Sequence, residues 1–201
     1  EWLFPYNQPE TMAALSAFYQ KYYADAQPRH FLFGINPGRF GAGVTGVPFT
    51  DPVRLEAECG IENPFAKKQE LSSQFVWMFI RAYGGGQAFC RDFYITSISP
   101  LGFVKNGVNI NYYDDRALQA AVEPFILWNI RTQLEFGARR EAAVCIGEGQ
   151  NFKFFKKLNE RQGFFREIVP LPHPRWVMQY RRKRADEFAE RYVEALQQLA
   201  G

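Results

Sequence analysis

Short apolar segments alternate with longer amphipathic segments along most of this 201-residue chain. Apolar runs of roughly four to eight residues predict buried strands, whereas apolar positions that recur about every 3.6 residues predict helices. The strands are expected at His30–Ile35, Asp92–Ile98, Ala142–Ile146 and Phe164–Val169. The helices are expected at Thr11–Tyr23, Gln69–Tyr83, Asp114–Phe136, Glu148–Gln162 and Arg184–Leu199.

The alternation of strands and helices predicts the fold class. Such chains form right-handed crossovers that build a parallel sheet with helices on both faces. We therefore expect an α/β fold, a three-layer α/β/α sandwich with a four-stranded parallel sheet. Pro124 falls inside one expected helix and predicts a kink there. No repeat or low-complexity linker interrupts the pattern, so a single domain over residues 1–201 is expected.

The loop that follows the first expected strand is the candidate active site. Residues Phe31–Pro52 read FLFGINPGRFGAGVTGVPFTDP, with five glycines, three prolines and Asn36 at the first bend. Glycines allow positive φ and close backbone approach, and prolines make the bends rigid. A polar side chain at the carboxyl end of a strand lies where α/β sheets bind ligands. The alternative is a plain tight turn in which Asn36 is a local cap.

The cysteines and histidines argue against disulfide bonds and against a metal site. Cys59, Cys90 and Cys145 are odd in number and widely spaced, so they indicate neither a disulfide framework nor a metal site. His30 and His173 are the only histidines, and neither belongs to a cluster with ligand spacing. We expect no metal and no cofactor.

Charge is distributed unevenly along a chain whose net charge is only +3. Residues 151–184 contain ten Lys or Arg and two Glu, whereas residues 185–201 are mainly acidic. A basic stretch of this kind attracts phosphates and indicates nucleic-acid binding. The alternative is an ordinary solvated helix face.

No segment has the sequence of a membrane span. The longest apolar run, Phe75–Ile80, is far shorter than the roughly 20 residues that a spanning helix needs. The beginning of the chain shows no basic-then-apolar signal. We expect a cytoplasmic protein with no membrane partner.

Three motifs resemble those of one enzyme family, the single-strand-selective monofunctional uracil-DNA glycosylases. Gly34–Gly38 (GINPG), Phe40-Gly41 and Thr45–Phe49 (TGVPF) resemble the first motif of the family without gaps. Leu171–Pro174 (LPHP) is similar to its His-Pro motif. Ser97–Leu101 (SISPL) occupies the place of a third motif, in which the family has an asparagine before Pro-Leu.

The resemblance implies a uracil-DNA glycosylase fold and a function in base excision repair. The expected reaction is hydrolysis of the N-glycosidic bond of uracil or a related deaminated base in single- or double-stranded DNA, by a monomer. Departure of the base leaves cation-like charge on the sugar and negative charge on the base. Asn36 would orient the water, His173 would donate to the departing base, and Phe49 would stack on it. The remaining first-motif residues expected at the base are Gly34, Ile35, Pro37 and Gly38.

The chain departs from the family at the residue that reads the base. Ser97 stands where the family has an asparagine, and a hydroxyl is shorter than an amide. Asn109 and Asn111 follow soon after and can fill the gap, so we expect them at the substrate. The alternative is a plain polar loop.

The segment after the His-Pro motif also departs from the family. The family continues His-Pro-Ser-Pro-Arg, and this chain reads His-Pro-Arg-Trp-Val. The residues expected to wedge into the strand and hold phosphates are Arg175, Trp176, Gln179, Arg181, Arg182 and Lys183.

Other functions remain open at the level of the residues. The same fold can serve as a non-catalytic nucleic-acid-binding protein. A nucleotide- or sugar-phosphate-handling α/β enzyme can use Gly147-Glu148-Gly149 as an anion cradle. Phe49 is then a core residue, and His173 is a structural histidine between two prolines.

Overall fold

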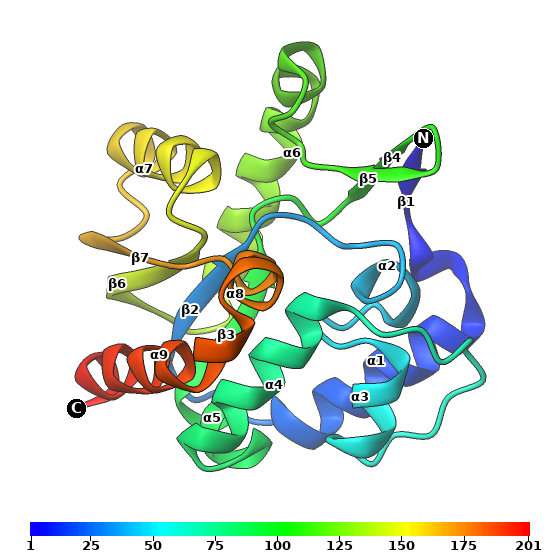
Figure 1. The fold of residues 1–201 in the computed structure, drawn as a ribbon. Coiled ribbons are helices and arrows are strands. Elements are labelled where there is room, and N and C mark those ends of the chain that lie inside the picture. The colour runs from blue at the N-terminus through cyan, green and yellow to red at the C-terminus, as the bar shows by residue number, and fades with distance from the viewer.

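The structure, a computed structural model, describes residues 1–201 and confirms the expected three-layer α/β/α fold. Its centre is a four-stranded sheet in which every neighbouring pair is parallel (Figure 1). The strand order is β3 (Phe93–Ser97), β2 (Arg29–Gly34), β6 (Ala138–Ile146) and β7 (Glu167–Leu171). Strand β2 therefore lies inside the sheet, and β3 is an edge strand.

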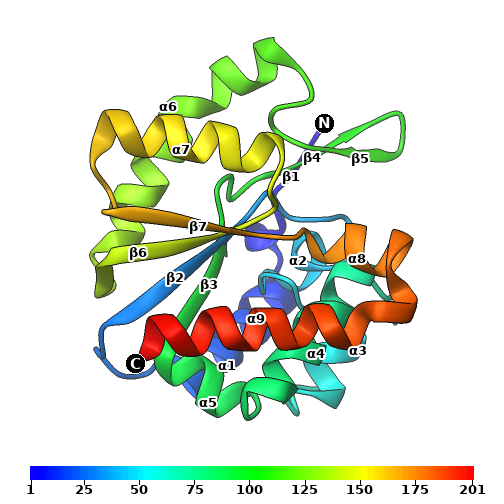
Figure 2. The ribbon, with the colours of Figure 1, turned by 60° about the vertical axis from the view of Figure 1, so that its left-hand side comes forward.

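Helices cover both faces of this sheet (Figure 2). One face carries α6 (Arg116–Leu134) and α7 (Gln150–Gln162). The other face carries α1 (Pro9–Tyr22), α4 (Leu71–Tyr83), α5 (Gly86–Asp92), α8 (Pro174–Tyr180) and α9 (Ala185–Ala200). None of the helices combines the length and the apolar composition needed to cross a lipid bilayer.

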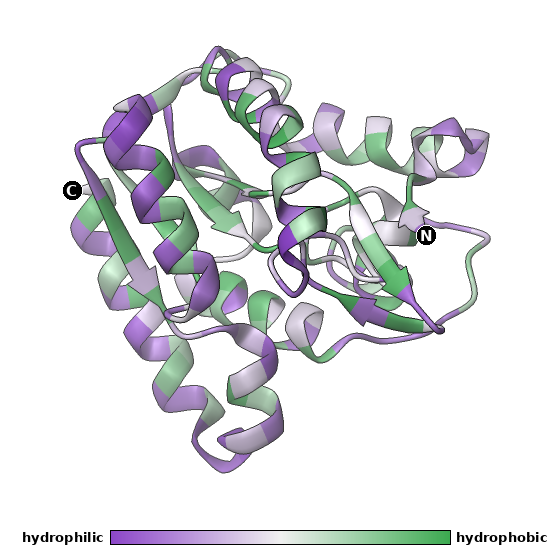
Figure 3. Ribbon diagram, turned by 90° about the horizontal axis from the view of Figure 1, so that it is seen from above, coloured by the Kyte–Doolittle hydropathy of each residue, from purple (hydrophilic) through white to green (hydrophobic).

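The alternation of side chains along β2 divides the core into two clusters. Leu32 is buried with the helices of one face, whereas Phe31 and Phe33 are buried with α6 and α7 on the other. A parallel sheet covered on both faces needs apolar residues at successive positions, which explains the run of large side chains in this strand. The surrounding helices alternate between hydrophobic and hydrophilic residues, because each has one buried and one exposed side (Figure 3).

The last expected strand is wrong in its first residues. It was placed at Phe164–Val169, but β7 begins at Glu167. Phe164 and Phe165 are buried in the loop after α7, where the Asn159 amide bonds both backbone groups of Phe165 at 2.8 Å. Two adjacent buried aromatic residues are typical of a strand in a sequence, although here the Asn159 side chain, and not a neighbouring strand, satisfies the backbone of Phe165.

A second, small antiparallel sheet was not expected from the sequence. It consists of β1 (Trp2–Leu3), β4 (Gly102–Lys105) and β5 (Val108–Ile110). Asn106 and Gly107 connect β4 to β5 with φ values of 52° and 72°, which a two-residue hairpin turn requires. The segment that contains Asn109, for which a plain polar loop was the alternative, is therefore part of a β-hairpin. Strands of two to four residues are too short for a periodic signal.

Other short elements also escape a periodicity argument. They are α2 (Ala42–Thr45), α3 (Pro52–Ala57) and two 3-10 turns, η1 (Pro5–Asn7) and η2 (Arg182–Arg184). Pro124 does lie inside α6, as expected.

A hydrogen bond from helix α9 stabilises the end of β7, and its contribution to stability can be tested. The buried Tyr192 hydroxyl donates a 2.6 Å hydrogen bond to the carbonyl of Pro172, the residue directly before His173. The Tyr192→Phe variant leaves this carbonyl without a partner, so we expect the free energy of unfolding in urea to fall by about 1–3 kcal/mol. Tyr180→Phe is the control, because Tyr180 is 60% exposed. Equal effects of the two changes would contradict this role.

Candidate active site

A cavity of about 730 Å³ lies at the carboxyl ends of the four parallel strands. Each strand contributes one of its lining residues: Asn36 follows β2, Ser97 ends β3, Gly147 follows β6 and His173 follows β7. This is the edge of an α/β sheet at which ligands bind. The sheet thus brings together residues from all three sequence motifs.

The side chain of Asn36 is held by the segment that follows β5. Its Oδ1 accepts a 3.1 Å hydrogen bond from the Tyr112 backbone N–H. Its Nδ2 lies 3.4 Å from the carbonyl oxygens of Ile110 and Pro37. The amide is therefore oriented by backbone groups, and one lone pair of Oδ1 remains for another donor.

The Phe49 ring packs on the end of β2 at Gly34. A Cβ atom at position 34 would overlap this ring, so only glycine allows the approach. Phe49 itself has a φ of 53°, which is unusual for a residue other than glycine. The Ser73 hydroxyl fixes this backbone by donating a 2.7 Å hydrogen bond to the Phe49 carbonyl. Phe49 lines the cavity and also contacts the core, so both interpretations of this ring hold in part.

Glu70 supports the glycine-rich loop and was not singled out from the sequence. Its carboxylate accepts a hydrogen bond from the Phe40 N–H and lies so close to Gly38 and Gly41 that a Cβ atom at either position would overlap it. Burial raises the pKa of this carboxyl, although the hydrogen bonds that it accepts from backbone N–H groups oppose the shift. Asp51 continues the support by accepting from the Glu70 N–H at 2.9 Å. A single acidic residue before a helix carries no motif by which it could have been recognised.

His173 caps the N-terminus of α8 with its ring. The Nδ1 atom accepts a 3.1 Å hydrogen bond from the Arg175 N–H, so the proton of the neutral ring belongs on Nε2. Burial, and secondarily the charge of Arg175, lower the pKa of His173 to about 4. At neutral pH the ring is therefore an uncharged hydrogen-bond donor.

Tyr112 and Asn151 form a buried hydrogen-bonded pair that was not predicted from the sequence. The Tyr112 hydroxyl donates to Asn151 Oδ1 at 2.8 Å, and Asn151 Nδ2 reaches the Gly34 carbonyl at 3.4 Å. These contacts connect the segment after β5 to the start of α7 and to the end of β2. Only the tertiary structure brings these three segments together.

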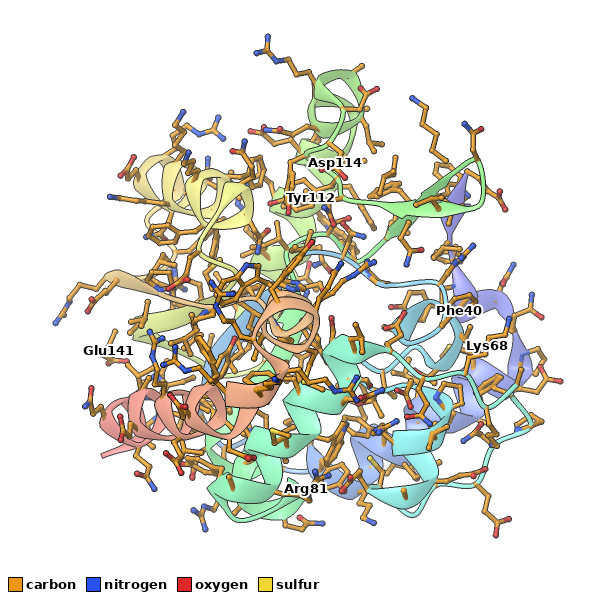
Figure 4. The ribbon with its side chains drawn as sticks, viewed as in Figure 1. Phe40, Lys68, Arg81, Tyr112, Asp114 and Glu141 are labelled. Carbon is orange, nitrogen blue, oxygen red and sulfur yellow. The ribbon has the colours of Figure 1, made fainter.

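The three base-reading candidates all line the cavity, but their surroundings differ. Ser97 is the last residue of β3, and Asn109 Oδ1 accepts a 3.3 Å hydrogen bond from the Arg39 N–H. Asn111 is instead directed toward Asp114, which accepts from its backbone N–H at 2.7 Å and lies beside Tyr112 at the start of α6 (Figure 4).

The candidate DNA contacts divide into two groups. Arg175, Trp176 and Gln179 line the mouth of the cavity, and Trp176 is 39% exposed. Arg181 stacks over the Trp176 ring at 5.0 Å, whereas Arg182 lies beyond it in η2. Lys183 is also in η2 and, like Arg181 and Arg182, does not line the cavity.

Additional cations lie on another side of the mouth. The Phe40 ring is flanked by the side chains of Arg39, at 4.5 Å, and Lys68, at 4.6 Å (Figure 4). Gly147, Glu148 and Gly149 line the same cavity and do not form a separate site. The cysteines are buried apart from one another, and no three His, Cys, Asp or Glu side chains converge as a metal ion would require.

Comparisons with known proteins agree with this geometry. The family model of the uracil DNA glycosylase superfamily matches residues 20–197. The crystal structure of wild-type Pedobacter heparinus SMUG2 is similar over 99% of this chain and 88% of that chain, with a TM-score of 0.95 and 44% sequence identity. A comparison with curated proteins finds no match.

The family match covers most of the chain, and the solved relative has nearly the same backbone. Both findings confirm the resemblance inferred from the sequence motifs. This chain belongs to the uracil-DNA glycosylase superfamily and is a SMUG-like DNA glycosylase, a hydrolase of DNA repair.

Proposed function

We propose that this glycosylase removes uracil or a related deaminated base from DNA by monofunctional hydrolysis, with Asn36 and His173 as its catalytic residues. The observation that carries the proposal is the neutral His173 ring, which has Nδ1 occupied and Nε2 available in the same cavity as Asn36 and Phe49. No lysine lies in the three motifs, so no Schiff-base step is expected.

A neutral donor suits the departing base. The base leaves with negative charge on its oxygen, and a hydrogen bond from a fixed N–H stabilises that charge more in the transition state than in the substrate. The backbone N–H of Arg175 holds the His173 ring in one tautomer, so no reorganisation is needed during the reaction.

Asn36 would orient the water. Its Oδ1 retains a lone pair after accepting from the Tyr112 N–H, and the rigid loop prevents the amide from turning away. The target base must leave the DNA stack before this water can attack its sugar. Phe49 supplies a flat face for the extruded base.

DNA is the proposed partner, bound across the mouth of the cavity. Arg175, Trp176 and Gln179 would contact the strand next to the extruded base, while Arg181, Arg182 and Lys183 would attract phosphates. We propose that the monomer is sufficient, because one chain contributes all of these groups.

Replacing Asn36 tests the assignment of the water-orienting residue. We expect Asn36→Ala to lower the single-turnover rate of uracil excision by on the order of 10², because one transition-state interaction is lost. Binding of uncleaved DNA should change little. Asn36→Asp is the control, because it keeps an oxygen for the Tyr112 N–H and for the water. Unchanged excision by Asn36→Ala would remove Asn36 from the mechanism.

The pH dependence tests the state of His173. Since its pKa is lowered to about 4, we expect the single-turnover rate to show no inflection near the ordinary histidine value of about 6.5. The rate should fall only as the pH approaches 4, where protonation of Nδ1 breaks its bond to the Arg175 N–H.

Unfolding experiments give an independent measure of the same pKa. Below pH 6.5 His173 is protonated in the unfolded chain, whereas the folded ring stays neutral until the pH approaches 4. The free energy of unfolding should therefore decrease as the pH falls from 6.5 toward 4. In the His173→Asn control this contribution should disappear. An inflection of the wild-type rate near 6.5 would contradict a neutral, shifted histidine.

Base recognition is proposed to combine Ser97 with Asn109. Uracil and hypoxanthine both present a lactam edge, an N–H beside a carbonyl, which needs one acceptor and one donor. The Ser97 hydroxyl can accept from the N–H, and Asn109 Nδ2 can donate to the carbonyl while its Oδ1 binds the Arg39 N–H. Asn111 is less suited, because it is directed toward Asp114.

Separate substitutions of the two asparagines test this assignment. Asn109→Asp keeps the acceptor for the Arg39 N–H but removes the donor, so we expect excision of both uracil and hypoxanthine to fall about tenfold or more. Asn111→Ala should leave both rates within about twofold, because it removes no contact to the base. The reverse pattern would make Asn111 the reader, and no effect from either would leave Ser97 and backbone groups in that role.

A further inference from the structure

A second cavity, of about 640 Å³, opens along the free edge of the sheet. Its walls come from the edge strand β3, from α1 on one face of the sheet and from α6 on the other (Figure 2). None of its 20 lining residues is charged. This distinguishes it from the first cavity, which is lined by Arg39, Glu70, Glu148 and Arg175, and indicates an uncharged ligand.

Two amides on α6 in this wall lack hydrogen-bond partners. Asn129 and Gln133 are four residues apart and therefore share one side of the helix. Asn129 Nδ2, a donor, and Gln133 Oε1, an acceptor, are buried and bonded to no other protein group. The Gln133 residue is only 7% exposed, so its amide is costly to leave unsatisfied. Both residues line the cavity, and a ligand there would reach these atoms after rotation about the terminal side-chain torsions, which are soft.

Other hydroxyl groups in this wall already have hydrogen-bond partners within the protein. The hydroxyls of Tyr19 and Tyr94, which also line the cavity, are 3.0 Å apart and bond each other. The Thr132 hydroxyl donates to the Trp128 carbonyl. Among the groups that line this cavity, the buried atoms without a hydrogen-bond partner are thus those of Asn129 and Gln133.

Aromatic rings beside these amides form a flat, accessible surface. Phe125 and Trp128 stack with their ring centroids 5.6 Å apart and their planes at 16°. Trp128 is 59% exposed, and Phe136 at the end of the same wall is also exposed. Exposed rings of this kind are the platforms on which nucleobases stack.

The two cavities have a common wall. Pro37, Ala42 and Ser97 line both of them, so the second cavity begins directly behind the candidate active site.

We propose that the second cavity binds an uncharged nucleobase by its lactam edge. The base N–H would donate to Gln133 Oε1, its carbonyl would accept from Asn129 Nδ2, and its face would lie against Trp128. The proposal rests on the proposed function for the source of the ligand. The ligand is either the free base released in the candidate active site or an unpaired base of the bound DNA strand. Both sources present the same edge.

The central variant is Gln133→Met, which keeps the length of the side chain and removes the amide. In the free protein it removes a buried group without a partner, so we expect the melting temperature to rise, by about 2–4 °C. In the same variant, base binding should weaken about tenfold or more. Gln119→Met is the matched control, since it makes the same change in α6 outside the cavity, and it should leave binding unchanged.

Trp128 provides the binding signal. Of the four tryptophans, Trp77 is buried, so in a Trp2→Phe, Trp176→Phe background Trp128 is the only exposed one. Quenching of its fluorescence would be titrated with free uracil, free hypoxanthine and an oligothymidylate that contains no uracil. A stacked base at this ring should quench it with a saturable dependence on concentration.

The outcomes separate the sources and decide the proposal. Saturable quenching by a free base that is weakened in Gln133→Met identifies a released-base site, and quenching by oligothymidylate alone identifies a site for a strand base. Quenching that is absent, or identical in Gln133→Met, overturns the proposal. So does an unchanged or lower melting temperature of Gln133→Met, or a loss of self-association in that variant, which would make this face a contact between two copies. Uracil excision measured in parallel reports on the proposed function separately, since base binding here requires no cleavage.

Discussion

The close approach of the Phe49 ring to Gly34 is the constraint on which the rest of the site depends. The ring occupies the space of a side chain at the end of β2, so the loop from Asn36 onward folds back across the strand that it leaves. Phe49 adopts a positive φ to make this contact, and Ser73 on α4 holds its carbonyl. A strained backbone persists only where its surroundings over-determine it. The glycine-rich loop is therefore held by packing at its end and by Glu70 at its middle.

The electrostatics of the cavity follow from partial burial. Arg175 brings positive charge beside His173, which helps to keep that ring neutral, and the same charge favours the ionised form of Glu70. Burial raises the pKa of Glu70 and lowers that of His173, so both groups resist charge for the same reason. The proposed mechanism, in which the site stabilises negative charge on the departing base, would use this neutral donor beside the positive charge of Arg175.

The fold could be predicted from the sequence because its main strands and helices are long and periodic. Each expected helix is present within two residues of its expected ends, and all four strands of the parallel sheet exist. The start of β7 was wrong because Phe164 and Phe165 are buried in a loop, which apolar composition does not distinguish from a strand. The β4–β5 hairpin was missed because its strands are shorter than any period.

The residues that lie at the cavity were partly predictable for a related reason. Asn36 and His173 stand in contiguous motifs next to strand ends, so their convergence follows from the parallel sheet. Glu70, Asn151 and Tyr112 act through contacts between distant segments, and no local pattern marks them. Their roles become visible only when the tertiary structure brings the segments together.

The β4–β5 hairpin connects the proposed reader of the base with the proposed water ligand. The Ile110 carbonyl and the Tyr112 N–H orient Asn36, and Asn109, which lies in β5, binds the Arg39 N–H in the loop that follows Asn36. A shift of this hairpin therefore moves both the proposed reader and the proposed water ligand. Effects of substitutions at Asn36 and Asn109 are then not independent, because residues that share one hydrogen-bond network couple energetically. A base that fits the reader poorly would also disturb the water, so selectivity would arise in the rate of bond cleavage as well as in binding.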